Sequence, residues 1–188
     1  MLDKDMTAME IKKELEGKGD FVQIDQLTRL LKEKIRPEVR KFVHQKLGEI
    51  YESKGMLLDA ARMFNNVAIA SMAFTEKKNY HMKEAELYIM ASKFEDADEA
   101  VKKAMREANA PERAEILITI KEFYRKQAGI FEFNRRKNHA AKIYEKLLAM
   151  DISNVEKKEI KTKLLVLYEN LGMIQEYMAL KREGESNS

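Results

Sequence analysis

The sequence predicts an all-α protein, and three observations support this fold class. Apolar residues recur at steps of three and four along the whole chain, which is the period of an amphipathic helix. Only two Pro and seven Gly interrupt the 188 residues, and no segment alternates apolar and polar residues over the length of a strand. The connections between the periodic segments are short, so we expect consecutive helices to pack as antiparallel neighbours.

Two helix starts carry the capping-box pattern. Thr7 precedes Glu10 by three residues, and Ser153 precedes Glu156 by the same spacing. In this pattern the hydroxyl and the carboxylate each satisfy a backbone N–H that the first helical turn leaves without a partner. Together with the apolar period, these signals predict about ten helices. They span residues 8–16, 21–35, 37–54, 57–72, 76–92, 94–108, 111–134, 138–150, 154–171 and 173–183.

Three other residues mark helix starts. Asp20 is predicted to cap a helix that begins at Phe21, because a short acidic side chain accepts well from the first-turn N–H groups. Pro37 and Pro111 suit the first helical positions, where the missing N–H costs nothing.

The composition is that of a folded protein with an ion-paired surface. Hydrophobic residues make up 45% of the chain, which excludes a disordered protein. The 35 Lys and Arg are interleaved with 32 Asp and Glu, and a net charge of only +3 argues against a strongly basic nucleic-acid-binding surface. The chain has no Cys, which excludes disulfides, thiolate metal sites and thiol nucleophiles.

The sequence carries no signal for secretion or membrane insertion. The first residues, MLDKDMTAMEIKKELEG, alternate charges and lack the apolar core of a secretory leader. The most apolar run, from Val67 to Phe74, is far shorter than a bilayer span. We therefore expect a cytoplasmic protein that does not bind a membrane.

One pattern of small and large residues recurs along the chain. A pair of short helices carries it, and such a pair buries only one of its faces, so neighbouring copies must stack to complete a core. The matching residues are Gly48, Tyr51, Leu57, Ala60, Phe64 and Val67 in the first clear copy, Ala85, Tyr88, Phe94, Ala97, Val101 and Ala104 in the second, Ala128, Phe131, Ala140, Tyr144 and Leu147 in the third, and Leu165, Tyr168, Gly172 and Ile174 in the fourth.

The copies share a turn position, whose spacing defines the repeat. Successive turns are 37, 43 and 37 residues apart, at Gly55, Ser92, Arg135 and Gly172. The six additional residues between the second and third turns are predicted to lengthen one helix to about 24 residues, or some 35 Å. Upstream, Gly19 lies 36 residues before Gly55 and Phe21 matches Leu57, so residues 8–35 are predicted to form a degenerate copy.

This pattern resembles that of tetratricopeptide repeat proteins. Leu47, Gly48, Tyr51, Gly55, Ala60 and Phe64 match the family outright. The second and third copies replace Gly48 by Ala85 and Ala128 and lack the turn Gly. The resemblance implies an α-solenoid of antiparallel helix pairs in a right-handed superhelix. It also implies one domain over residues 1–183, with degenerate helices in 1–40, repeats in 41–181, and a disordered tail at 184–188.

The sequence offers no catalytic or metal-binding constellation. The three His are His44, His81 and His139, and none has a second ligand at metal-site spacing. His44 and His81 fall at equivalent positions of successive copies, where the family often has an aromatic packing residue. We therefore expect no enzyme activity, no metal and no cofactor.

The resemblance places a binding groove on the first helices of the pairs. Its surface combines carboxylates with apolar residues, which suits a peptide or protein segment with basic and apolar side chains. Gln45, Glu49 and Glu86 replace the cations that family members use to hold a C-terminal carboxylate, which argues against that mode of binding. The predicted groove residues are Phe42, Gln45, Glu49, Glu52, Asn79, Met82, Glu86, Ile89, Met90, Glu122, Arg125, Gly129, Glu132 and Phe133.

Two other functions fit the sequence. A ribosome-associated or RNA-binding repeat protein would use the basic run of Arg135, Arg136 and Lys137, although such runs are usually solvated helix ends. A self-associating protein would pair Tyr177 and its neighbours Met178 and Leu180 with another subunit as a homo-oligomer. The main expectation remains a non-enzymatic adaptor that binds protein.

Overall fold

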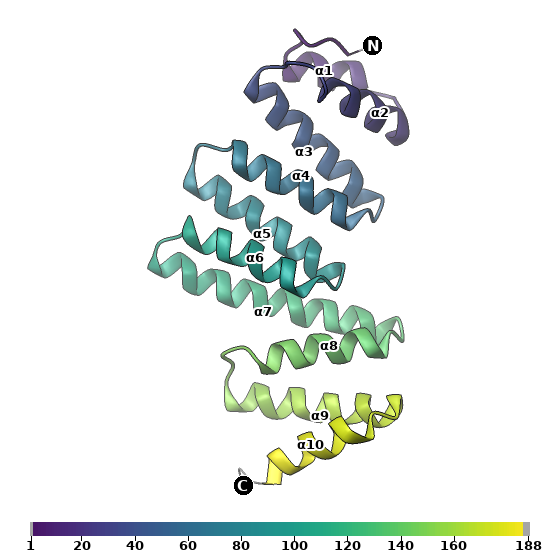
Figure 1. The fold of residues 1–188 in the computed structure, drawn as a ribbon, viewed down its shortest axis with the longest axis vertical. Coiled ribbons are helices and arrows are strands. Elements are labelled where there is room, and N and C mark those ends of the chain that lie inside the picture. Colours follow the sequence, from purple (N-terminus) through teal and green to yellow (C-terminus); the bar gives the residue numbers. More distant parts are fainter. Residues whose placement is uncertain (1, 186–188) are drawn as a thin grey trace. The chain divides into compact units, whose positions relative to one another are not determined.

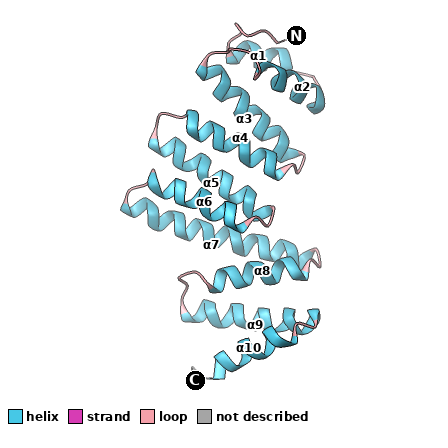
Figure 2. Cartoon of the chain, in the orientation of Figure 1, coloured by secondary structure: helices cyan, strands magenta, loops and turns pink. Residues whose placement is uncertain are grey.

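A computed structural model describes residues 2–185 of the chain. Within that range the chain forms ten α-helices joined by short loops and contains no strand (Figure 2). The predicted all-α class is confirmed, and except for one helix the predicted bounds lie within two residues of the observed ones. The helices are α1 (Ala8–Leu15), α2 (Asp20–Leu30), α3 (Pro37–Ser53), α4 (Leu57–Ala70), α5 (Phe74–Met90), α6 (Phe94–Arg106), α7 (Ala110–Phe133), α8 (Lys137–Leu148), α9 (Asn154–Leu171) and α10 (Ile174–Glu185).

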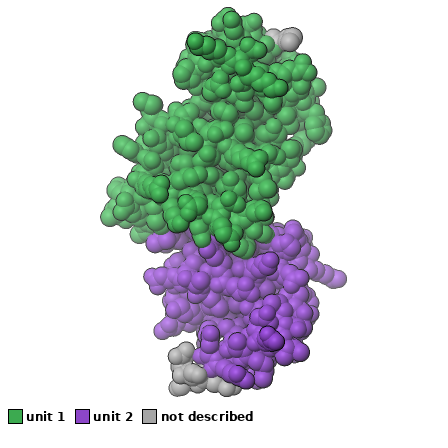
Figure 3. All heavy atoms as spheres, in the orientation of Figure 1, with its two compact units in different colours: residues 1–116 green, residues 117–188 purple. Residues whose placement is uncertain are grey.

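The chain divides into two compact units, residues 1–116 and residues 117–188 (Figure 3). The division falls inside α7, whose 24 residues match the length predicted for the extended helix. The sequence indicates no boundary within residues 1–183, and a single domain over that range stays a prediction. Of the tail predicted to be disordered, residues 186–188 lie outside the described part of the chain, and α10 runs to Glu185.

In the first unit, consecutive helices pack against each other. Each of α3, α4 and α5 contacts the helix that follows it, and α1 and α2 pack on α3 (Figure 1). Gly48 is the point of closest approach between α3 and α4, because a Cβ there would lie 3.1 Å from Cζ of Phe64. Ala60 is fully buried beside this contact. The predicted role of small residues in bringing paired helices together is therefore confirmed here.

In the second unit, α8 packs on α9 and α9 packs on α10 (Figure 1). Two buried tyrosines fill its core and direct their hydroxyls to carboxylates. The Tyr144 hydroxyl donates to Glu132 Oε2 at 3.0 Å, and the Tyr168 hydroxyl donates to Glu145 Oε1 at 2.9 Å. Burial and these hydrogen bonds both raise the pKa of each phenol.

The turn geometry repeats as the sequence predicts. At every predicted turn position from the first clear copy onward, the backbone is left-handed, with φ between 57° and 71°. In each case the N–H of the next residue donates to the carbonyl of an aromatic residue five positions earlier, which closes the last helical turn. The turn residues and their aromatic partners are Gly55 with Tyr51, Ser92 with Tyr88, Arg135 with Phe131, and Gly172 with Tyr168.

The degenerate first copy has a different turn residue from the one predicted. Gly17, with φ of 74°, is left-handed, whereas Gly19 is an extended N-cap with φ of −65°. Asp20 does not cap α2, because it is the first helical residue and its carboxylate pairs with Lys54, the C-cap of α3. The predicted turn was two residues too late and the predicted cap one residue too late, since Gly17 and Gly19 are equally plausible turn residues in the sequence alone.

The capping boxes are confirmed. Thr7 and Ser153 each accept from the N–H of a Glu three residues later, and that Glu accepts from the cap N–H. Asn109 and Glu112 make the same reciprocal pair before α7, at 2.9 and 3.0 Å, and the sequence analysis did not predict it. Asn is as good an N-cap as Ser, so the three-residue spacing of Asn109 and Glu112 was the signal for this cap in the sequence.

Helix α2 ends at Leu30, five residues before the predicted end. The residues that follow form turns whose carbonyls accept from Arg40 of α3. Its guanidinium donates to Leu31 O at 3.2 Å and to Glu33 O at 3.0 Å. This tertiary hydrogen bonding replaces the helical pairing that the apolar period predicted.

Candidate binding surface

The predicted groove residues lie on the first helices of successive pairs, and their exposure differs. Glu49, Arg125, Glu132 and Phe133 are exposed, whereas Gln45, Glu52, Met82, Glu86 and Met90 are half-buried. Those on α3 and α5 belong to the first unit, and those on α7 belong to the second.

Ile89 does not belong to this surface, which corrects the prediction. Its side chain is only 1% exposed. It lies four residues after the fully buried Ala85, so the helical period places both on the core side of α5. Met90 also packs partly against the core cluster that contains Phe64. The spacing from Ala85 was the sequence signal that would have excluded Ile89.

Ion pairs occupy the predicted carboxylates of the first unit. Lys83 Nζ donates to Glu52 Oε1 of α3 at 2.6 Å and to Glu86 Oε2 of its own helix at 3.0 Å. Burial of the ammonium would lower its pKa, but the two carboxylates outweigh that effect and raise it. The two predicted binding groups therefore share one cation within the unit and keep a net charge of −1 between them.

Other charged residues join the same helices. Lys41 of α3 donates to Glu76 Oε1 of α5 at 2.6 Å, and Lys78 of α5 pairs with Glu112 at the start of α7. Glu49 accepts from Gln45 Nε2 at 3.1 Å. The surface of α3 and α5 is thus a set of matched charges, and such pairs contribute specificity more than affinity.

A buried polar cluster joins α4, α5 and α6, and the sequence analysis did not find it. Glu84 is 2% exposed, and its two oxygens meet His81 Nδ1 at 2.9 Å and Lys103 Nζ at 3.0 Å. Lys103 also donates to Asn65 Oδ1 at 3.0 Å. The available signal was a carboxylate at the repeat position that Leu47 holds in the preceding copy. Its burial assigns the cluster to packing of the three helices, because a ligand cannot reach Glu84.

His44 supports a packing role for the equivalent histidine. Burial, with a smaller effect from Arg40, lowers its pKa. Its Nδ1 is buried and has no hydrogen-bond partner among the described residues, since Leu47 stands where His81 has Glu84. The imidazole is therefore held as a neutral packing group.

The second unit presents the most open part of the predicted surface. Gly129 is exposed, and a Cβ built on it would meet nothing within 4 Å. Phe133, four residues on and at the end of α7, is 90% exposed. Ile130 beside them is 40% exposed. We call Gly129, Ile130 and Phe133 the α7 apolar surface.

The charges around the α7 apolar surface are also engaged. Arg125 pairs with Glu156 of α9, and Glu132 accepts from Tyr144. The Ser153 capping interactions lower the pKa of the Glu156 carboxyl to about 2, with Arg125 adding to the effect. These two charged side chains therefore have partners within the unit, whereas the ring of Phe133 is left exposed to solvent.

Within residues 2–185 no three His, Asp or Glu side chains gather as metal ligands would. No helix in that range is long and apolar enough to cross a membrane. The fold and the surface together define a class: an all-α protein of consecutively packed helices that exposes apolar side chains on several of them, with Phe133 of α7 among the most exposed. No protein-family model matches the chain, and no curated protein matches it.

Proposed function

We propose that this chain is a tetratricopeptide-repeat-like, non-enzymatic scaffold of the cytoplasm that binds a protein segment. The repeated left-handed turns and the aromatic carbonyls that close them support the repeat. The single observation that carries the binding function is the α7 apolar surface, where Phe133 is 90% exposed.

The energetics of this surface favour a partner. Gly in a helix interior costs about 1 kcal/mol relative to Ala, and at Gly129 no neighbouring helix requires the missing Cβ. Covering one Phe side chain contributes about 1.5–3 kcal/mol. A partner whose apolar side chains cover Phe133 would gain this free energy. The missing Cβ at Gly129 would let the partner backbone come close.

The partner chemistry follows from what the surface leaves open. The sequence predicted basic and apolar partner residues, but Glu52 and Glu86 already share Lys83. Apolar contact with Phe133 is therefore the main determinant, and basic residues of the partner are secondary.

Two substitutions test the proposal without harming the fold. Crosslinked partners are recovered and identified with the wild type, and binding of the identified segment is then measured. Phe133→Ser should weaken binding about tenfold or more, since it removes the covered ring. Gly129→Leu should also weaken binding, because it blocks backbone approach.

Val155→Ser is the matched control, because Val155 is 79% exposed in the same unit but lies at the start of α9. It should bind as the wild type does. Equal binding by Phe133→Ser and the control would remove the α7 apolar surface from the proposal.

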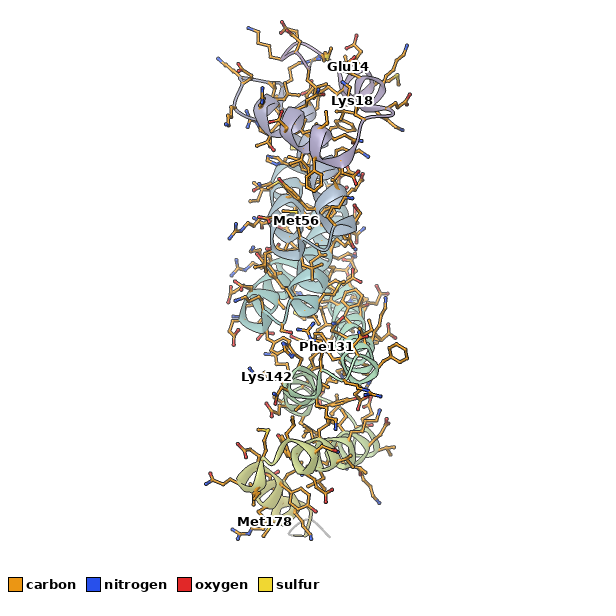
Figure 4. All side chains as sticks on the ribbon, turned by 90° about the vertical axis from the view of Figure 1, so that its right-hand side faces the viewer. Glu14, Lys18, Met56, Phe131, Lys142 and Met178 are labelled. Atoms are coloured by element: carbon orange, nitrogen blue, oxygen red, sulfur yellow. The ribbon has the colours of Figure 1, made fainter. Side chains whose placement is uncertain are left out.

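Self-association remains a second proposal, supported by α10. Met178 of α10, labelled in Figure 4, is 46% exposed, and Ile174 is 73% exposed. Their spacing of four places them on one side of the helix. Sedimentation across concentrations tests it. A dimer that Met178→Glu dissociates supports pairing through α10, and a monomer at all concentrations removes it.

A further inference from the structure

The turn between α7 and α8 gathers cations that no carboxylate neutralises. Arg135, Arg136 and Lys137 are consecutive, and none makes an ion pair with another residue of the described chain. Lys137 Nζ donates to the neutral Asn170 Oδ1 at 3.0 Å, which leaves its charge uncompensated. In the same unit Arg125 and Lys163 have carboxylate partners, whereas isolated lysines such as Lys126 have none among the described residues, so it is the clustering of three cations that sets this turn apart.

A shallow, solvent-open cavity of about 340 Å³ lies at this turn, lined by Arg135, Arg136, Lys137, Asn138, His139 and Leu171. The side chain of Arg136 is held in place there. Its guanidinium carbon lies 4.8 Å from the ring centroid of Phe131, and its Nη2 donates to His139 Nε2 at 3.1 Å. A fixed guanidinium loses little entropy when it binds an anion.

His139 adds a hydrogen-bond donor. Arg has no acceptor, so His139 Nε2 must accept and the proton of the neutral ring lies on Nδ1. Burial, followed by Arg136 and Lys142, lowers the pKa of this imidazole, which is consistent with a positive surrounding. The side chain of Arg136, the N-cap of α8, makes no capping hydrogen bond.

The backbone at Arg135 carries strain. Its φ is 57°, at the repeat position that Gly55 and Gly172 occupy without strain. An Arg in this conformation is kept at a cost. Ser92 has the same conformation at the equivalent turn, so the strain belongs to the repeat. Unpaired charge and an open cavity are the features that distinguish the turn after α7.

We infer that this turn binds an acidic segment of a partner protein, whose carboxylate or phosphate group enters the cavity between Arg136 and Lys137. Bidentate contact with a guanidinium suits either group. The inference goes beyond the proposed function, because it does not require the α7 apolar surface.

A single anionic group fits this turn better than a polynucleotide. A nucleic acid must bring several phosphates along a continuous basic track. The basic run of Arg135, Arg136 and Lys137 is only three residues long, which matches one anionic group and offers no such track.

Fluorescence anisotropy with defined probes tests the inference. The probes are a labelled Glu-rich peptide, its Gln counterpart, the same peptide with phosphoserine, and a uridine oligonucleotide. The Glu and phosphoserine peptides should bind more tightly than the Gln peptide, and more weakly as salt is raised. Equal binding of the Glu and Gln peptides, or tightest binding of the oligonucleotide, would overturn the inference.

Arg135→Gly separates binding from folding. It removes a cation and relieves the backbone, so the urea midpoint should rise while acidic-peptide binding weakens about fivefold. Ser92→Gly is the matched control: Ser92 has φ of 58° at the equivalent position, so its midpoint should rise with binding unchanged. Arg136→Gln should weaken binding about tenfold.

Phe133→Ser distinguishes this inference from the proposed function. It should leave acidic-peptide binding intact even where it abolishes binding at the α7 apolar surface. Unchanged peptide affinity in both Arg135→Gly and Arg136→Gln would show that the turn is not the anion site.

Discussion

The contact between Gly48 and Phe64 gives the sharpest test of how the repeat packs. A Cβ added at Gly48 would lie 3.1 Å from Cζ and 3.2 Å from Cε1 and Cε2 of Phe64. These distances are a few tenths of an ångström shorter than ordinary contact, so the ring must move. Phe64 is 4% exposed and stacks on Tyr80 with 6.0 Å between ring centroids, which limits that movement.

The size of the effect follows from two opposing terms. Gly48→Ala gains about 1 kcal/mol from helix propensity. Overpacking against a confined ring costs about 1–3 kcal/mol. We therefore expect Gly48→Ala to lower the free energy of unfolding by about 1 kcal/mol. In a Phe64→Leu background the clash disappears, and the same Ala should be stabilising by about 1 kcal/mol.

Urea unfolding followed by helical circular dichroism measures all four proteins of this cycle. The coupling between the two sites should be about 2 kcal/mol. Ala85→Gly with Val101→Leu is the matched cycle in the next copy, where the residue equivalent to Phe64 is Val101, and its coupling should be near zero. If Gly48→Ala has the same effect beside Phe64 and beside Leu, close approach does not explain this glycine.

Three other predictions rest on different features. Ser92→Gly should raise the free energy of unfolding by about 1 kcal/mol in urea unfolding, because it removes left-handed strain; no gain would mean that the turn is unstrained. Lys103→Met should lower the free energy of unfolding by about 3 kcal/mol, because Glu84 stays buried without its cation. Glu84→Leu combined with Lys103→Met should recover most of that loss. The pKa of Glu156 is about 2 when folded and near 4.5 when unfolded, so its contribution to stability is complete above pH 4.5 and lost as the pH falls towards 2. Glu156→Gln should therefore flatten the acid limb of a stability–pH profile, and an unchanged limb would contradict the assignment.

Much of the exposure of the candidate surface was predictable, because a repeat register fixes which helix face a residue occupies. The family resemblance placed Phe133 and Gly129 on this surface, and both are open to solvent. The same resemblance placed Ile89 there, although its spacing of four from Ala85 already assigned it to the core side of α5, where it is buried.

Charge pairing could not be read from the register. Glu52 and Lys83 are 31 residues apart, and their ion pair exists because α3 and α5 are neighbours in the first unit. The buried Glu84 likewise meets Lys103 across two helices. Glu52 was predicted as a binding group because a sequence alone does not show that Lys83 lies beside it.

The sequence by itself determined the helices and the four clear turns, because both depend on interactions among residues at most five positions apart. The apolar period sets each helix, and a left-handed residue with its carbonyl partner ends it. The tertiary structure alone decided which charges remain unpaired, because pairing depends on side chains from separate helices. At the turn after α7 it left three cations and a cavity, which is the reason that an ordinary basic run becomes a candidate site.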